Sequence, residues 1–179
     1  MSKYQAKSDA QTIGKNILGT VQALGSFKGT AYSYLEKCGL LDLKPDQWYP
    51  MQSYCDFFEM LADSTGAKTL QVIGRSLGQN IDLANGAETI GKVYESFNMD
   101  FKAKYRNTNP DEGFMVNQTS ATSCQIVFTG PFPSEFMRGV LEGIGRQLSD
   151  IEYMTVTIDE TQPRIETGGK STTFSLIWR

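Results

Sequence analysis

The sequence predicts a single α+β domain over residues 1–179, in which a helical part, 1–106, precedes a sheet-plus-helix part, 107–179. Two observations predict this order. Apolar residues recur every three or four positions through the first part, as in amphipathic helices. In the second part they fall in two pairs of short β-rich runs around one helical segment, which gives the order β-β-α-β-β. We therefore expect one core and a four-stranded, mostly antiparallel sheet.

Five helices are predicted in the helical part, each with an apolar stripe at helical spacing and a glycine or polar turn near its end. The predicted helices are Ser8 to Gly25, with Ser8 and Asp9 as N-cap; Phe27 to Cys38; Met51 to Gly66; a fourth marked by Leu70, Ile73, Leu77 and Ile81; and a fifth after Asn85-Gly86, marked by Ile90, Val93, Tyr94, Phe97 and Phe101. The segment LKPDQWYP, broken by Pro45 and Pro50, is a predicted connector.

The sheet-plus-helix part follows a polar turn that ends at Pro110. Runs at 113–118 and 123–129, separated by a small polar turn, indicate a hairpin. A helix is predicted over 134–148, with Ser134 as its N-cap. The last two strands alternate, and each places three apolar residues on one face: Met154, Val156 and Ile158 in the first, and Phe174, Leu176 and Trp178 in the second.

Glycines inside the helix GPFPSEFMRGVLEGIGRQL have two interpretations. A dinucleotide-binding turn needs its glycines between strand and helix, where backbone amides face the phosphates. Here Gly139 and Gly143 lie inside the helix, four residues apart on one face, where missing side chains allow a neighbouring element to approach. We therefore favour packing over phosphate binding, although Arg138 and Arg146 keep the phosphate alternative open.

Composition excludes several classes of function. With 17 basic and 20 acidic residues, the net charge of −3 gives no field for nucleic acid or an anionic membrane surface. Three widely spaced cysteines favour a reducing, cytoplasmic setting over a disulfide framework or a zinc site. The N-terminus lacks a signal-like apolar region, and no apolar run is long enough for a membrane span. The absence of histidine excludes histidine-based triads and histidine-ligated heme.

The stretch GVLEGIGRQL, preceded by a strand and a proline-containing turn, resembles a helix of the heme-nitric oxide/oxygen-binding (H-NOX) family and of the related 4-vinyl reductase ligand-binding domains. The resemblance extends through ILGTVQAL, WYPMQSYCDFFEMLADSTG, LQVIGRSLGQNI and FNMDFKAKY to the closing β-β-α-β-β, all in the family's order. It implies an H-NOX-like fold and a ligand-binding signalling domain.

The chain departs from that family where the family holds heme. In H-NOX domains a histidine follows an Asn-x-Asp that Asn98-Met99-Asp100 resembles, but Phe101 to Lys104 offers none. The family's Tyr-x-Ser-x-Arg, which holds the propionates, would fall near Ile126 to Gly130, which reads IVFTG. Tyrosine, cysteine or methionine can also ligate iron, but the sequence positions none of them for it. We expect a heme-free relative without a cofactor or bound metal.

The candidate ligand site is a set of apolar side chains on two predicted helices, which could line a cavity between helices and sheet. Its members are Tyr54, Phe57, Phe58, Leu61, Ile90, Tyr94, Phe97 and Phe101. The alternative is that they form ordinary core. Asp56 and Glu59 could do acid–base work, but a solvated helix face explains them better. The cysteines lie on apolar faces without a histidine to activate a thiol.

Three functions remain open at this point. The first is a sensory or regulatory module that binds a mostly apolar molecule with one polar end and signals to a protein partner. The second is a structural or adaptor protein that acts through homodimerisation or partner binding without a ligand. The third is an enzyme, supported only by the 4-vinyl reductase resemblance, because no nucleophile, base or cofactor loop is evident. We expect the first.

Overall fold

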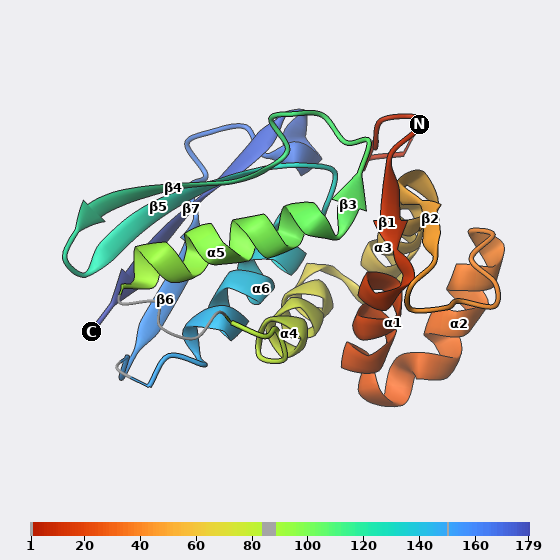
Figure 1. Ribbon diagram of the computed structural model, residues 1–179, viewed down its shortest axis with the longest axis horizontal. Helices are drawn as coiled ribbons and strands as arrows, with labels where there is room; N and C mark the ends of the chain where they lie inside the picture. The colour runs from red at the N-terminus through yellow and green to blue at the C-terminus, as the bar shows by residue number, and fades with distance from the viewer. Residues whose placement is uncertain (1, 84–88, 150) are drawn as a thin grey trace.

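The structure is a computed structural model that describes residues 2–83, 89–149 and 151–179. Within these ranges the chain forms an α+β fold with two antiparallel sheets (Figure 1). The helices are α1 Gly14–Ala23, α2 Lys28–Lys37, α3 Met51–Thr65, α4 Ala67–Gly78, α5 Ile90–Ala103 and α6 Ser134–Gly145, with 3₁₀ turns η1 Gly25–Phe27 and η2 Ile165–Thr167. The strands are β1 Gln11–Ile13, β2 Trp48–Pro50, β3 Tyr105–Arg106, β4 Gly113–Ser120, β5 Ser123–Thr129, β6 Met154–Ile158 and β7 Ser171–Trp178.

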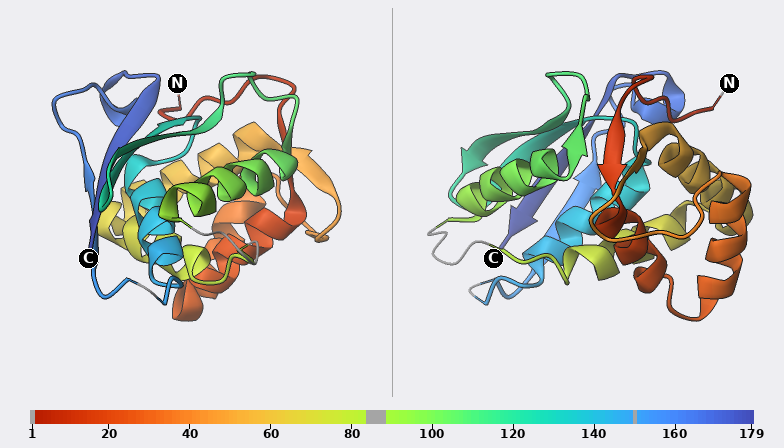
Figure 2. Two further views of the ribbon diagram at one scale, coloured as in Figure 1. Left: turned by 60° about the vertical axis from the view of Figure 1, so that its left-hand side comes forward. Right: turned by 45° about the vertical axis from the view of Figure 1, so that its right-hand side comes forward.

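The four-stranded sheet has the order β4-β5-β7-β6, with every neighbouring pair antiparallel, so the predicted β-β-α-β-β order is confirmed. Helices α5 and α6 cover one face of this sheet, and the opposite face carries no helix (Figure 2). Side chains on the covered face are buried because the strands alternate. The buried members are Phe114, Cys124, Ile126, Phe128, Val156, Thr172, Phe174, Leu176 and Trp178.

A second, three-stranded sheet was not predicted. It has the order β2-β1-β3 and joins segments that lie far apart in the sequence. Because β1 occupies Gln11–Ile13, the first helix begins at Gly14, and the predicted N-cap at Ser8 and Asp9 is wrong. The predicted connector LKPDQWYP ends in β2, which pairs with β1. The predicted helix start after Asn85-Gly86 lies outside the described residues.

Helices α4 and α6 each carry glycines where they face one another, and they cross with their backbones in contact. A Cβ atom added at Gly74 or Gly78 of α4 would overlap backbone atoms of α6. One added at Gly139 or Gly143 of α6 would overlap backbone atoms of α4 in turn. Only glycine allows two helices to approach so closely. The α6 glycines therefore serve packing, as predicted, and Gly145 packs against Met154 of β6.

Side chains reinforce this crossing on both sides. Glu142 of α6 accepts hydrogen bonds from Gln71 Nε2 at 2.7 Å and from Arg75 Nε at 2.9 Å, both on α4. Gln147 Nε2 donates to the carbonyl oxygen of Gly78 at 2.7 Å, beyond the end of α6. The helix predicted over 134–148 therefore stops at Gly145, and the residues after it cap the neighbouring helix instead.

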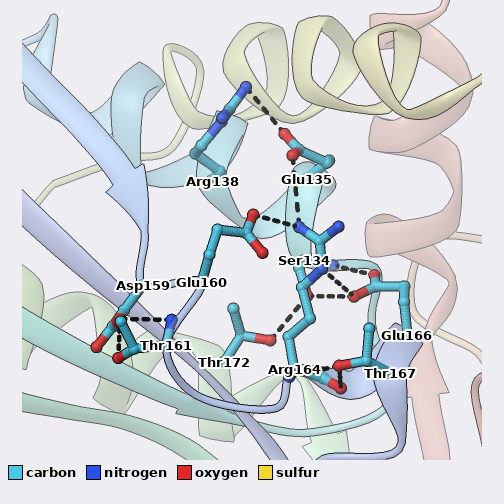
Figure 3. Close-up of polar contacts among 10 residues, drawn as sticks. All are labelled: Ser134, Glu135, Arg138, Asp159, Glu160, Thr161, Arg164, Glu166, Thr167 and Thr172. Atoms are coloured by element: carbon cyan, nitrogen blue, oxygen red, sulfur yellow. Dashed lines mark hydrogen bonds and ion pairs between the residues drawn. The ribbon is translucent and has the colours of Figure 1, made fainter.

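The N-terminus of α6 is held by a carboxylate of the chain itself (Figure 3). Ser134 is the first helical residue after Pro133, so its predicted role as N-cap is wrong. Glu166 of η2 accepts hydrogen bonds from the backbone N–H of Ser134 at 2.7 Å and from its hydroxyl at 2.6 Å. Anions are favoured at helix N-termini. Glu166 thus takes the position that the phosphate alternative would give to a ligand.

Candidate functional site

The eight predicted site residues lie on the buried faces of α3 and α5. Tyr54, Phe57, Phe58 and Leu61 of α3 are buried, as are Tyr94, Phe97 and Phe101 of α5, whereas Ile90 is partly buried. The two helices meet around aromatic side chains from the turn before α6 and from the four-stranded sheet.

Phe132, in the turn before α6, joins these aromatic groups. Its ring centroid lies 5.7 Å from those of both Tyr54 and Phe58 of α3. It also lies 6.3 Å from the ring of Phe101 of α5 and 6.4 Å from that of Phe128 of β5. Edge-to-face and tilted pairs at such distances stabilise a core beyond their area burial. Much of the predicted set is therefore interlocked.

A small, partly open space remains between α1, α3, α4, α5 and α6, and we call it the inner cavity. Its volume is about 60 Å³. This is room for a few carbon atoms, well below the roughly 300–1,000 Å³ of pockets that bury drug-sized ligands. Most of its lining side chains are apolar. They are Asn16, Tyr54, Leu77, Ile81, Phe97, Asp100, Phe101, Lys104, Tyr105, Phe132, Phe136, Met137 and Val140.

A wider depression lies next to the inner cavity, between α1, α4 and the C-terminal end of α5, and we call it the outer cleft. Its volume is about 560 Å³. Its lining is mostly polar or small: Lys15, Asn16, Leu18, Gly19, Gln22, Ala23, Pro45, Ser76, Leu77, Asn80, Ile81, Asp82, Asp100 and Lys104.

Five residues line both spaces and form what we call the neck: Asn16, Leu77, Ile81, Asp100 and Lys104. Lys104 and Asp100 are one helical turn apart at the end of α5 and form an ion pair. The small, mostly apolar inner cavity therefore adjoins the larger, polar outer cleft through a neck that contains both apolar and polar side chains. Such a shape suits a molecule with an apolar end and a polar end.

Three of the eight predicted residues, Tyr54, Phe97 and Phe101, line the inner cavity. The others lie elsewhere in the core. Phe58 packs against Phe132 and Phe136, which line the inner cavity, but Phe58 itself does not line it. The hydroxyl of Tyr94 donates to the carbonyl oxygen of Leu141 at 2.9 Å and so ties α5 to α6.

The sequence analysis missed the contribution of α6 and of the turn before it. Phe132, Phe136, Met137 and Val140 line the inner cavity but were not among the candidates. The only available signal was the spacing of Phe136 and Val140, which places them on one helical face. The polar neck residue Asn16 had no signal of its own.

Two tyrosine side chains line the inner cavity, but other contacts engage their hydroxyl groups. The Tyr54 hydroxyl lies 2.6 Å from that of Thr20 on α1, and burial raises the pKa of Tyr54. Burial also raises the pKa of Tyr105, whose hydroxyl is hydrogen-bonded to Thr12. Both phenols are therefore neutral at ordinary pH, and neither is activated as an anionic iron ligand.

The residues at the family's heme-binding positions do not fit a heme. Phe101, near the expected place of the ligating histidine, is packed among aromatic rings, and Lys104 is paired with Asp100. In the segment that would hold the propionates, Phe128 is buried in the same aromatic group. Phe101 and Phe128 offer no polar group, and the Lys104 ammonium is already paired with Asp100.

The cysteines give no sign of a reactive or metal-binding site. All three are free. Burial raises the pKa of the Cys124 thiol to about 11, and it also raises that of Cys38 and Cys55. Thiols with raised pKa values are poor nucleophiles at neutral pH. Among the described residues, no group of three or more Cys, Asp or Glu is placed to hold a metal ion.

Comparison with known proteins identifies the fold. No family model matches the chain, and no curated protein sequence matches it. Solved H-NOX structures, in contrast, match the chain in three-dimensional structure. A variant from K. algicida with unliganded Fe(II) has a TM-score of 0.66 at 9% identity, covering 93% of this chain and 96% of its own. A variant from S. oneidensis in the Fe(II) ligation state has a TM-score of 0.65 at 10% identity, with coverage of 93% and 96%.

A variant from T. tengcongensis has a TM-score of 0.59 at 12% identity, covering 93% of this chain and 97% of its own. The chain thus has an H-NOX-like fold over nearly its whole length, as the resemblance implied. Identities of 9% to 12% establish a shared fold but not a shared function. The function is therefore inferred from the geometry of the candidate site. In the described part of the chain, no helix is both long enough and apolar enough to cross a membrane.

Proposed function

We propose that the protein is a heme-free sensory or regulatory module that binds a small, mostly apolar molecule in the inner cavity. The observation that carries this proposal is the apolar inner cavity next to a polar outer cleft, on a scaffold shared with H-NOX structures. The close backbone packing of α4 against α6 supports a signalling role. Leu77 of α4 and Val140 of α6 line the cavity near the glycine crossing, so a ligand there contacts two tightly coupled helices.

Heme is left out of the proposal because the sequence has no histidine and reads IVFTG where the family has Tyr-x-Ser-x-Arg, and because the inner cavity of about 60 Å³ is small. We expect added hemin to give no saturable, one-to-one shift of the Soret band, and the purified protein to be colourless. The control is bovine serum albumin, titrated in parallel to define non-specific hemin uptake. A clean stoichiometric titration would contradict the heme-free assignment and point to ligation by Tyr54, Tyr105 or a cysteine.

Ligand binding is tested by thermal shift with short-chain alcohols, short-chain fatty acids and small isoprenoids, which match the size of the inner cavity. A ligand that binds only the folded state stabilises it by ~2.7 kcal/mol at a hundredfold excess over Kd. We expect at least one compound to raise the Tm in a saturable way. Ile81→Trp, which fills the neck with a larger side chain, should abolish the shift. Val72→Trp, on the exposed face of α4, should leave the shift unchanged.

A structural or adaptor role through homodimerisation or partner binding is the second candidate. It is favoured by the rings of Tyr54, Phe58 and Phe132, which pack against one another with centroids 4.8–5.7 Å apart. If no compound in the screen moves the melting curve, this role replaces ligand sensing. The free thiols suit the cytoplasmic location that we propose for either role. No catalytic role is proposed.

A further inference from the structure

The charges around the neck and outer cleft are balanced. Two cations, Lys15 and Lys104, and two anions, Asp82 and Asp100, line the outer cleft. Only Lys104 and Asp100 also line the inner cavity, and they are paired with each other. Their side chains are 29% and 42% exposed, so a charged group brought to the neck would lose part of its water without meeting an unpaired charge of opposite sign, and that loss costs free energy.

The hydrogen-bonding groups at the neck include both donors and acceptors. The Lys104 ammonium donates and the Asp100 carboxylate accepts. Asn16 donates from Nδ2 to the Thr12 hydroxyl at 3.3 Å, and its amide oxygen accepts no hydrogen bond from the described residues. A hydroxyl group can donate to Asn16 or Asp100 and accept from Lys104. A carboxylate can only accept, and an ammonium can only donate.

We propose that the neck selects ligands with a neutral hydrogen-bonding head, such as an alcohol, whose apolar tail enters the inner cavity. The inference rests on the proposed function, because it names the class of molecule that the same site takes. The small inner cavity, lined by Phe97, Phe101 and Met137, favours a thin, unbranched tail. Asn16, Asp100 and Lys104 are the residues that set specificity for the head.

The test compares three probes with the same tail and different heads: hexan-1-ol, hexanoate and hexylammonium, each titrated by calorimetry. We expect hexan-1-ol to bind at least about tenfold more tightly than either ion, because only its head is satisfied without an unpaired charge. Tighter binding of hexanoate or hexylammonium would overturn the head-group inference and leave the proposed function standing. No binding by any of the three would overturn both.

Two charge variants at the neck should each strengthen the binding of a different charged probe. Asp100→Asn leaves Lys104 without its anion and should strengthen hexanoate binding by about tenfold. Lys104→Met leaves Asp100 without its cation and should strengthen hexylammonium binding instead. Asp63→Asn, which removes one partner of the exposed Lys3–Asp63 pair away from the cleft, is the matched control and should change neither. Equal effects of Asp100→Asn and Asp63→Asn would contradict the assignment to the neck.

Discussion

Gly143→Leu is expected to destabilise the protein by ~3 kcal/mol or more, because it forces a side chain into a helix crossing that has no space for one. The Cα of Gly78 and the backbone N of Gln79 lie 2.8 Å from the position of a Cβ at Gly143, and backbone atoms cannot turn aside as a side chain can. Even Gly143→Ala should lower the free energy of unfolding. Chemical denaturation measures the free energy of unfolding of each variant.

Gly29→Ala is the matched control. Gly29 also lies in a helix, α2, but no neighbouring atom lies within 4 Å of an added Cβ. Alanine is favoured over glycine in a helix, and Gly29 is the second residue of α2, so this variant should keep the stability of the parent or gain up to ~0.5 kcal/mol. If Gly143→Leu melted like the parent protein, the close crossing of α4 and α6 would be wrong.

Phe132→Ala is expected to cost ~3–5 kcal/mol, the range for removing a large buried aromatic side chain. Phe132 is 1% exposed and contacts rings of α3, α5 and β5. Because it also lines the inner cavity, the substitution enlarges that space. Hexan-1-ol should then raise the Tm of the variant more than that of the parent, since a filled cavity restores part of the lost contact.

Phe27→Ala provides the comparison for this second variant. Phe27 is 58% exposed, so its replacement should change stability by less than ~0.5 kcal/mol and leave the effect of hexan-1-ol as in the parent. A small loss of stability in Phe132→Ala would show that the aromatic group does not pack around Phe132. A large loss without any gain from hexan-1-ol would count against a connected inner cavity.

Elements with a strong local pattern could be predicted from the sequence. The stripe Tyr54, Phe57, Phe58 and Leu61 predicted α3, and alternation around Val156 and Leu176 predicted β6 and β7. The spacing of Gly139 and Gly143 predicted close packing. It did not reveal that the partner helix is α4, because contact between distant segments leaves no local trace.

The three-stranded sheet and the cavity were beyond such reasoning for a related reason. Strand β1 has three residues and β3 has two, so neither shows a period, and pairing with distant strands holds them in place. The cavity depends on which aromatic side chains fill the space and which leave it open. Periodicity identifies the buried face of α3 but does not distinguish Tyr54, which lines the cavity, from Phe57, which does not.

The proposed ligand site is tested most directly by a crystal structure of the protein grown with hexan-1-ol. We expect density for the alkyl chain between Tyr54, Phe97 and Phe101, with the hydroxyl oxygen within hydrogen-bonding distance of Asn16, Asp100 or Lys104. Aromatic rings closed over this space, with no density for the chain in it, would contradict ligand binding at the inner cavity.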